Sequence, residues 1–288
     1  MAMKVKIWGC RGSIPAPGRE TLIFGGESTC VEIISDSGES LIVDAGSGIR
    51  RLGNKIMKEN GSKNLTILLT HAHWDHLAGF PFFKPAYSPE YSISFCGGPV
   101  PQESIMKYFT HQMEQPYFSV DISEMKAEFK AGCHCDQNLC DHCPGELKSI
   151  ACASIPINHP NGGYAFKFKS NEKVICFFPD NELGYAHEGG LTINEYADFC
   201  RGANLLIHDA QYTEEQYKKT KGWGHSTFKD TVDLALAAGV RNLGLFHHDP
   251  DRTDDDLQQQ ADFCKKYISE TGGKLNCFAC ADGMLLKI

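Results

Sequence analysis

The 288-residue sequence has no long hydrophobic run, no excess of positive charge and no low-complexity linker. A membrane-spanning helix needs about 18 or more consecutive apolar residues, and because no such run occurs we expect no membrane span. Residues 1–7 lack the apolar core and small-residue cleavage site of a signal peptide, so we expect a cytoplasmic protein. The formal net charge of -8 argues against a surface that attracts polyanions everywhere, although a local basic groove is compatible with it.

Short internal repeats are also absent, so we expect one domain over residues 1–288.

Cysteine, by contrast, is abundant. The 13 cysteines are an odd number and cannot all pair within one chain. Without an export signal, reduced thiols in a cytosol are the expected state.

Apolar runs alternate with turn residues and with helical patterns in both halves of the chain. This pattern predicts an α/β (α+β) fold, a four-layer αββα sandwich in which two sheets lie between helices. We expect Ser226 to cap one helix and Thr253 to open another. The expected strands lie near 4–8, 30–35, 40–44, 65–69, 92–95, 148–157, 164–169, 174–179, 204–208, 242–246, 275–278 and 284–288, and further helices near 49–58, 74–78, 102–111, 191–201 and 213–219.

A histidine run follows the apolar strand at 65–69. His71 and His73 are two residues apart in an extended or turning segment, so both imidazoles can converge on one point. Asp75 and His76 follow at once and can face a second point nearby. Chemistry at the C-terminal end of a strand is usual in open α/β sheets. The run therefore predicts a site for two metal ions.

The pattern His-x-His-x-Asp-His is also the signature of the metallo-β-lactamase superfamily, which this chain resembles over nearly its whole length. The resemblance is closer to the phosphodiesterase branch, which includes the tRNA 3′-processing endonucleases and the carbon-phosphorus lyase accessory phosphodiesterases. Gly224-His225-Ser226-Thr227 is similar to the Gly-His-Ser-Thr element of that branch, and residues 206–210 are similar to its segment that supplies an acidic residue.

The resemblance implies a ligand set that extends along the chain. His159, Asp180 and His247 each follow an expected strand and would complete the site. We prefer His247 to His248 because it comes first after the strand. Nitrogen and oxygen ligands suit zinc, and manganese or iron would also fit. By resemblance, the first metal takes His71, His73 and His159, the second takes Asp75, His76 and His247, and Asp180 bridges them.

The expected chemistry follows from the two positive ions. They would lower the pKa of a shared water so that hydroxide attacks phosphorus in line. An alkoxide leaving group needs a proton, and we assign that role to His225, oriented by Asp209. We expect Asp75 to be a catalytic residue as well as a metal ligand. The alternative for His225 is a helix-start residue that contacts backbone.

Residues 131–146 form a Cys-rich insertion. Cys133, Cys135, Cys140 and Cys143 have the donor type and number of a structural zinc site, which would fold a segment with few apolar residues. In the alternatives, His134 or His142 replaces one cysteine, or the thiols form a redox-active cluster.

Three functions compete at this point. We expect a phosphodiesterase that acts on small or cyclic phosphodiesters such as cyclic nucleotides. An RNA 3′-end endonuclease is the alternative, and nucleic acid is not favoured as a partner because residues 111–146 contain only Lys126 and Lys130 as strong bases. A redox or metal-sensing protein built on the Cys cluster is the third, and a lactamase or thioesterase would use the same metal chemistry.

The aromatic stretch 80–87 is either a homodimer contact or packing beneath a loop.

Overall fold

A computed structural model describes residues 2–96, 102–131 and 148–288. The predicted Cys-rich insertion lies outside these described residues almost entirely. The zinc or redox interpretation of Cys133, Cys135, Cys140 and Cys143 therefore stays a prediction, as does the single domain with an insertion. Within the described residues, every helix is too short or too polar to cross a bilayer.

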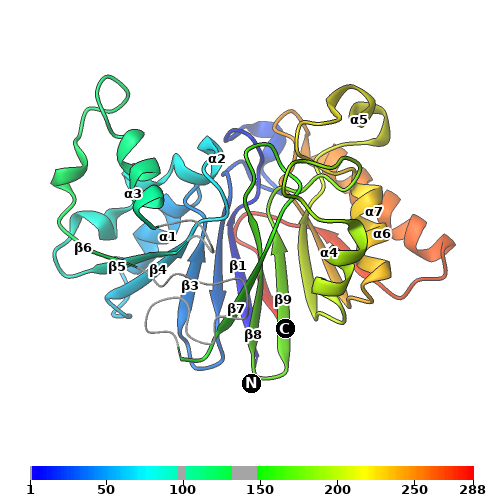
Figure 1. Cartoon of the computed structure of the whole chain (residues 1–288), viewed down its shortest axis with the longest axis horizontal. Helices are drawn as coiled ribbons and strands as arrows, with labels where there is room; N and C mark the ends of the chain where they lie inside the picture. The colour runs from blue at the N-terminus through cyan, green and yellow to red at the C-terminus, as the bar shows by residue number, and fades with distance from the viewer. Residues whose placement is uncertain (1, 97–101, 132–147) are drawn as a thin grey trace.

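Two sheets face one another in the middle of the molecule (Figure 1). The seven-stranded sheet has the order β13 (Leu285–Lys287), β1 (Lys4–Gly9), β2 (Cys30–Ile34), β3 (Ser40–Val43), β4 (Asn64–Leu68), β5 (Ser92–Cys96) and β6 (Glu128–Ala131). The six-stranded sheet has the order β12 (Asn276–Ala279), β11 (Asn242–Phe246), β10 (Leu205–Asp209), β9 (Lys173–Phe178), β8 (Tyr164–Ser170) and β7 (Ala151–Pro156).

Helices cover the outer faces of both sheets. The first sheet packs against α1 and α3, and the second packs against α4, α6 and α7. This arrangement confirms the predicted four-layer αββα sandwich. The helices are α1 (Ile49–Ile56), α2 (Trp74–Leu77), α3 (Gln102–His111), α4 (Ile193–Cys200), α5 (Glu214–Thr220), α6 (Phe228–Ala237) and α7 (Asp254–Glu270).

Central strands are apolar on both faces because each face meets another layer. In β10, Leu205 and Ile207 point into the core between the sheets, whereas Leu206 packs on the helix side. β4 does the same with Leu68 between the sheets and Ile67 under the helices. Strands buried on both faces read as continuous apolar runs, which is why the sequence reveals them.

Strand direction brings several loops to one end of the molecule. β9, β10 and β11 are parallel, and β7 runs the same way because β8 is antiparallel to both β7 and β9. The loop after β4 reaches the same end from the other sheet, since the Tyr164 amide at the start of β8 donates to the Thr70 carbonyl at 3.0 Å. Residues that follow β4, β7, β9, β10 and β11 therefore gather at one edge.

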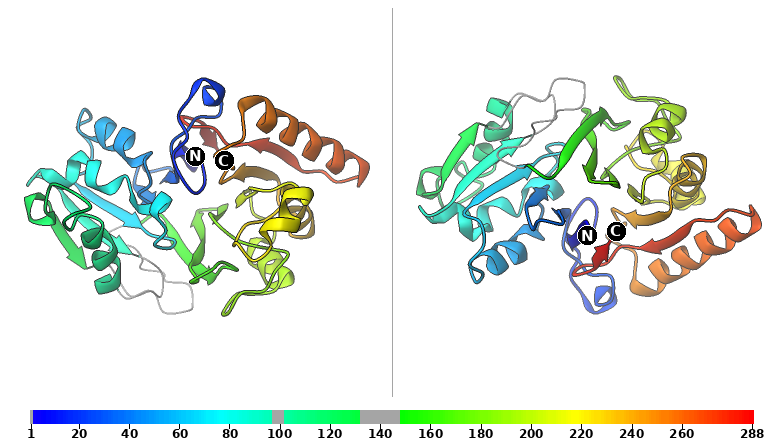
Figure 2. Two further views of the ribbon diagram at one scale, coloured as in Figure 1. Left: turned by 90° about the horizontal axis from the view of Figure 1, so that it is seen from above. Right: turned by 90° about the horizontal axis from the view of Figure 1, so that it is seen from below.

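The two ends of the chain lie side by side, as the views from above and below show (Figure 2). β1 pairs with β13 in antiparallel register, and the Ile288 amide donates to the Met3 carbonyl at 2.8 Å. The last strand thus closes onto the first, on the edge of the seven-stranded sheet.

Two local predictions need correction or addition. Ser226 does not cap α6: the Thr227 hydroxyl accepts the Asp230 amide at 3.0 Å, while the Ser226 hydroxyl is fully buried and accepts the Leu183 amide at 3.0 Å. The Ser226 hydroxyl thus makes a tertiary contact instead, one residue before the N-cap Thr227. β6 was not predicted, because four residues carry too short an alternation. Thr253 does open α7, with a capping box to Asp256.

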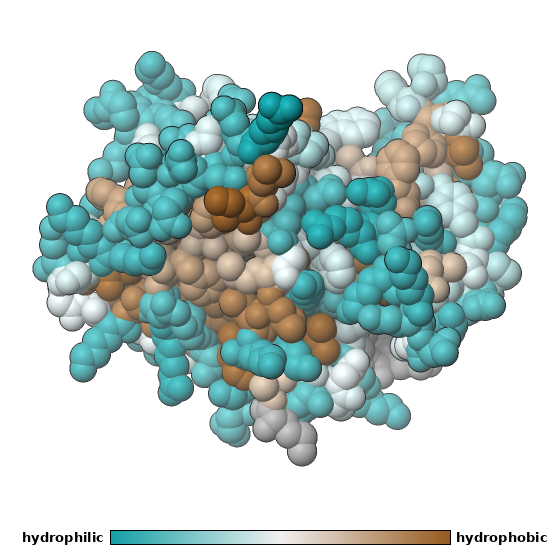
Figure 3. All heavy atoms as spheres, turned by 180° about the vertical axis from the view of Figure 1, so that it is seen from behind, coloured by the Kyte–Doolittle hydropathy of each residue, from teal (hydrophilic) through white to brown (hydrophobic). Residues whose placement is uncertain are grey.

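The aromatic stretch 80–87 is mostly core packing. Phe80 and Phe83 are fully buried in the cluster beneath α1 and α3, and only Phe82 is half exposed, with its ring on Phe118. The stretch therefore offers little partner surface. Apolar side chains gather instead near the middle of the rear face, which is otherwise mainly hydrophilic (Figure 3). The homodimer stays a prediction.

Substitutions at neighbouring phenylalanines distinguish packing from surface. Phe80→Ala should lower the free energy of unfolding by about 3–5 kcal/mol, because it opens a cavity beside the buried rings of Phe95 and Phe109 and the partly buried ring of Phe129. Phe82→Ala should cost less than about 1.5 kcal/mol, since that ring is 52% exposed. Urea unfolding followed by circular dichroism measures both, and equal losses would contradict the assignment.

Candidate metal centre

Two groups of potential ligands lie at the gathered strand ends and share one carboxylate. The ligand atoms within each group all lie within 4.8 Å of one another. All the members are buried except His73, which is partly exposed. The structure thus brings together all seven residues that the sequence singled out. One group is His71, His73, His159 and Asp180, and the other is Asp75, His76, Asp180 and His247.

The Asp180 carboxylate lies between the two groups and turns one oxygen toward each. Oδ1 is 3.1 Å from His76 Nε2 and 3.3 Å from His247 Nε2. Oδ2 is 3.4 Å from His71 Nε2 and 3.7 Å from His159 Nε2. This is the arrangement expected of a carboxylate that bridges two cations.

Each of four imidazoles is oriented through the ring nitrogen that faces away from Asp180. Because that nitrogen meets an acceptor, it carries a hydrogen, and in the neutral form of each ring, which is the form that binds metal, the lone pair of Nε2 points into the site. The Nδ1 contacts are His71 to Thr70 Oγ1 at 3.1 Å, His76 to Asp44 Oδ2 at 2.8 Å, His159 to the Gly224 carbonyl at 2.9 Å, and His247 to Gln211 Oε1 at 2.9 Å.

The donor set fits divalent metal ions. His71 Nε2, His76 Nε2 and Asp180 Oδ1 are buried and have no hydrogen-bond partner among the described residues, although they lie close together. Buried polar atoms rarely lack a hydrogen-bond partner. In addition, an imidazole lone pair that faces a carboxylate oxygen repels it unless a cation lies between the two. These atoms converge on common points, and imidazole and carboxylate are ligands that zinc, manganese and iron accept.

The pKa shifts of the ligand imidazoles run in opposite directions in the two groups. Burial lowers the pKa of His159 to about 2 and that of His73 to about 4, which keeps both rings in the neutral form that binds metal. Burial alone would also lower the pKa of His247, but Asp180 and Asp75 outweigh it and raise the value to about 9. For Asp75 and Asp180, burial is in turn outweighed by the imidazoles, which hold the pKa of both carboxyls well below the usual range.

The loop after β1 forms one wall of the site under backbone strain. The Ser13 amide donates to Asp75 Oδ2 at 2.8 Å, and a Cβ at Gly12 would lie 2.2 Å from the His247 ring. Ser13, Asp44 and His247 all have positive φ, at 63°, 61° and 55°. Such conformations cost of order 1–3 kcal/mol each in non-glycine residues and concentrate at functional sites.

His225 and Asp209 lie beside the second ligand group. His225 Nδ1 is 3.1 Å from Asp209 Oδ2, and the His225 ring stacks on that of His247 with centroids 4.7 Å apart. Asp209 also accepts the amides of Ser226 at 3.2 Å and Gln211 at 3.1 Å. The carboxylate therefore holds both the His225 ring and the backbone that carries it.

The structure also separates the two adjacent histidines after β11. His247 Nε2 approaches Asp75 Oδ2 at 3.0 Å, within the ligand group. His248 Nε2 instead donates to the Cys280 carbonyl at 2.9 Å. Only His247 points into the site.

Glu182 is a residue that sequence reasoning missed. Its carboxylate is fully buried and accepts four hydrogen bonds, from Tyr217 Oη at 2.6 Å, Gly222 N at 2.6 Å, His187 Nε2 at 2.8 Å and Gly224 N at 2.7 Å. It thereby fixes the turn whose Gly224 carbonyl orients His159. No local pattern marks such a residue, because all its partners except His187 lie at least 35 positions away. Asp44 and Gln211 were missed for the same reason, since they lie 32 and 36 positions from His76 and His247.

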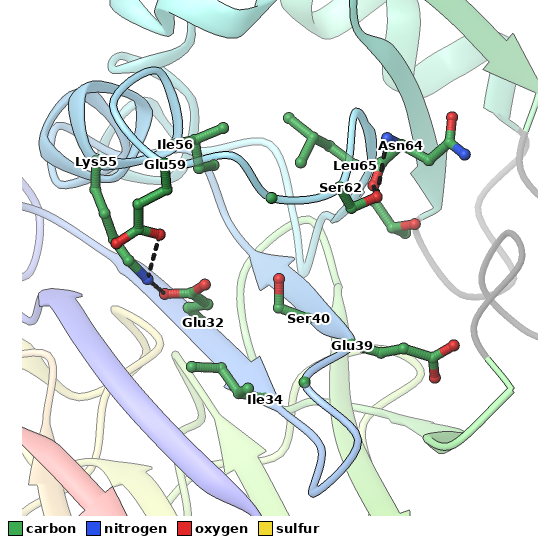
Figure 4. A pocket seen from close by; sticks show the side chains of 13 residues that line it. Glu32, Ile34, Glu39, Ser40, Lys55, Ile56, Glu59, Ser62, Asn64 and Leu65 are labelled. Atoms are coloured by element: carbon green, nitrogen blue, oxygen red, sulfur yellow. Dashed lines mark hydrogen bonds and ion pairs between the residues drawn. The ribbon is translucent and has the colours of Figure 1, made fainter.

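A separate pocket of about 330 Å³ lies between α1 and β2 to β4 (Figure 4). Lys55 Nζ lies 3.4 Å from Glu32 and 3.8 Å from Glu59, so the lysine forms ion pairs with both carboxylates. The pocket shares no residue with the ligand groups. Among the described residues, every group that could hold a metal belongs to the strand-end site.

Comparison with known proteins identifies the family. Residues 40–248 match the model of the beta-lactamase superfamily domain, which is more than half of the chain. The chain belongs to the beta-lactamase superfamily. A Ribonuclease Z of Porphyromonas gingivalis is 25% identical over 299 residues, covering 86% of this chain and 89% of the relative.

Solved structures share the superfamily fold. Human tRNase Z, short form, has a TM-score of 0.62 at 19% identity and covers 98% of both chains. A diphosphatase from the PhnP family has a TM-score of 0.67 at 15% identity, covering 99% of this chain and 98% of that one. The family match and these neighbours support the phosphodiesterase and tRNA-processing branch that the sequence resembles. The protein is a metal-dependent hydrolase of this superfamily, with ligand groups for two ions.

Glu182→Gln tests how far one carboxylate organises the site's rim. The substituted amide turns an NH₂ group toward two of the four donors, so we expect a loss of about 1–3 kcal/mol in the free energy of unfolding. Glu188→Gln is the matched control, because Glu188 is exposed on the neighbouring loop. Urea titration of both variants gives the comparison, and a Glu182→Gln protein as stable as the control would refute the anchoring role.

Proposed function

We propose that the protein is a phosphodiesterase with a two-metal centre. The observation that carries this proposal is the shared Asp180 carboxylate between two imidazole groups, with the His225–Asp209 pair stacked against one of them. We assign the first ion to His71, His73 and His159, the second to Asp75, His76 and His247, and the bridge to Asp180.

The metals themselves would be divalent, with zinc as our first choice and manganese or iron as alternatives. Bound there, the two ions would lower the pKa of a shared water and neutralise charge on the phosphoryl group. The superfamily fold and the donor set support this role for the site.

Two residues of the chain act on the leaving group: Asp209 orients His225, and His225 donates the proton. Asp209 holds the Nδ1 hydrogen of His225, so Nε2 is the atom that gives a proton to the departing oxygen. A carboxylate partner stabilises the imidazolium that must form before that transfer. Asp75, which we assign as a ligand, we also count as catalytic, because it contacts both His76 and His247 in the second group.

The substrate we favour is RNA cleaved at a 3′ end. Sequence reasoning ranked this activity second, whereas several curated relatives that cover most of the chain are named Ribonuclease Z. Small or cyclic phosphodiesters remain the second candidate because the net charge of -8 disfavours a polyanionic substrate over the surface as a whole. A redox or sensing role rests on the four cysteines outside the described residues, and the complete ligand set argues against a vestigial site.

Asp180→Asn tests the metal assignment. Because the amide removes the negative charge that both ligand groups share, we expect the purified variant to lose most of its bound metal. Elemental analysis of the folded protein measures this, with Asp255→Asn on the exposed first turn of α7 as the control. A variant that keeps two equivalents of metal would disprove the bridge.

A substrate panel tests both the reaction class and the proton donor. The metal-loaded protein should cleave a tRNA precursor, a cyclic nucleotide, or both, as well as bis(p-nitrophenyl) phosphate. His225→Ala should reduce kcat for the alkoxide-releasing substrates by roughly 10²-fold or more. It should affect bis(p-nitrophenyl) phosphate much less, because nitrophenolate leaves without a proton.

Two results of this panel would count against the proposal. Absence of turnover for every phosphodiester by the metal-loaded protein would exclude the reaction class. Full activity of His225→Ala on RNA or a cyclic nucleotide would exclude the proton donor while leaving the reaction class in place. The relative rates on the tRNA precursor and the cyclic nucleotide decide between the two substrate candidates.

A further inference from the structure

Residues 213–224, which we call the α5 segment, stand on the surface directly before His225. α5 contributes no buried residue to the core, and it rises at the same end of the molecule as α2 (Figure 1). Glu182 ties the segment to the site through Tyr217, Gly222 and Gly224. The segment is therefore largely exposed, whereas its end at Gly224 is buried and fixed against the His159 ring.

The α5 segment exposes acidic and polar side chains at its start, Glu214, Glu215 and Gln216, and mainly basic and aromatic ones toward its end. Lys218, Lys219 and Lys221 are all exposed in a chain of net charge -8. Lys218 pairs with Glu215, whereas Lys219 and Lys221 have no ion pair within the described part of the chain. Trp223, two residues before His225, is 63% exposed.

Helix stability explains only part of this composition. Acidic residues at the start of α5 and lysines in its last turn are what the helix dipole favours, which accounts for Lys218 and Lys219. Lys221 and Trp223 lie at and beyond the end of the helix, so the dipole does not account for them. A second exposed aromatic side chain, Tyr185, lies beside the turn, its ring 4.0 Å from where a Cβ on Gly222 would be.

We infer that the α5 segment binds the RNA strand next to the scissile phosphodiester. Lys219 and Lys221 contact its phosphates, and Trp223 stacks on a base. Basic side chains interleaved with aromatic rings are the recurring surface of proteins that bind single-stranded nucleic acid. Trp223 lies within about 8 Å of His225 along the backbone, so a stacked base would adjoin the bond to be cleaved. This inference rests on the proposed phosphodiesterase function and gives it a substrate class.

The same segment resolves the charge objection to RNA. That objection rested on residues 111–146, where the described part contains only Lys126 and Lys130 as strong bases, both close to glutamates. A local cluster beside the proton donor needs no positive net charge, because screening limits each interaction to roughly 8–10 Å at physiological salt.

Binding and turnover together test the α5 segment. The variants are the double substitution Lys219→Gln with Lys221→Gln, then Trp223→Ala and Trp223→Phe. The control is Lys265→Gln with Lys266→Gln, which removes the same charge from the last turns of α7. Fluorescence anisotropy of a labelled single-stranded RNA with the full-length protein in EDTA, over a range of salt, measures binding. The ratio of kcat/KM for RNA to that for bis(p-nitrophenyl) phosphate measures specificity.

The expected effects differ between variants. The double lysine variant should reduce the slope of log affinity against log salt by about 1.4, because each phosphate that a lysine no longer neutralises removes about 0.7 from the slope. Trp223→Ala should weaken RNA binding by about 5-fold to 100-fold, and Trp223→Phe should restore most of it because the ring is retained. Both changes should lower kcat/KM for RNA more than for the small diester, and the α7 control should alter neither ratio nor slope.

The outcomes separate this inference from the proposed function. An unchanged salt slope, or equal losses on RNA and on the small diester, would overturn RNA binding by the α5 segment while leaving the phosphodiesterase in place. RNA binding that depends on Lys219, Lys221 and Trp223, in a protein that cleaves no phosphodiester, would support the segment and refute the proposed activity.

Discussion

The fully buried Asp180 carboxylate is the constraint on which the rest of the structure depends. A charged group removed from water is costly unless opposite charge or strong donors surround it. Here four imidazole nitrogens lie within 3.7 Å of its two oxygens, and each comes from a different loop or from the histidine run. The carboxylate and these rings are stable together only when all the strand ends arrive at the same place.

Buried carboxylates keep those loops in place by accepting backbone and side-chain hydrogen atoms. Asp44 fixes His76 and Thr70, Asp209 fixes His225 and the turn behind it, and Glu182 fixes the α5 segment. The same network holds three non-glycine residues at positive φ. Such strain persists only where many surrounding contacts hold the backbone in place. This is expected of a site whose imidazoles must be oriented before a metal or substrate binds.

We propose that the surface around the metal ligands, more than the ligands themselves, sets the choice of substrate. The ligand groups suit hydrolysis of many phosphate esters, and the superfamily fold alone does not select among them. The α5 segment adjoins the proposed proton donor and carries the exposed lysines and tryptophan. A protein of net negative charge can therefore present lysines and an aromatic ring locally, on the surface beside the proposed proton donor.

The sequence by itself determined the layers and the histidine run, because both are local signals, whereas His159, Asp180 and His247 were added by the family resemblance. Strands such as β10 are apolar on both faces, and the run from His71 to His76 follows a strand, so each is recognisable within a few residues. Even the preference for His247 over His248 followed from position after a strand. Only the tertiary structure decided the partners, since Asp44, Gln211 and Glu182 act across long sequence separations. For the same reason the predicted Ser226 cap is wrong, and the sequence could not decide whether Phe80 is exposed or buried. A hydroxyl or an aromatic ring gives no sign in the sequence of whether its partner lies in the next turn or in a distant loop.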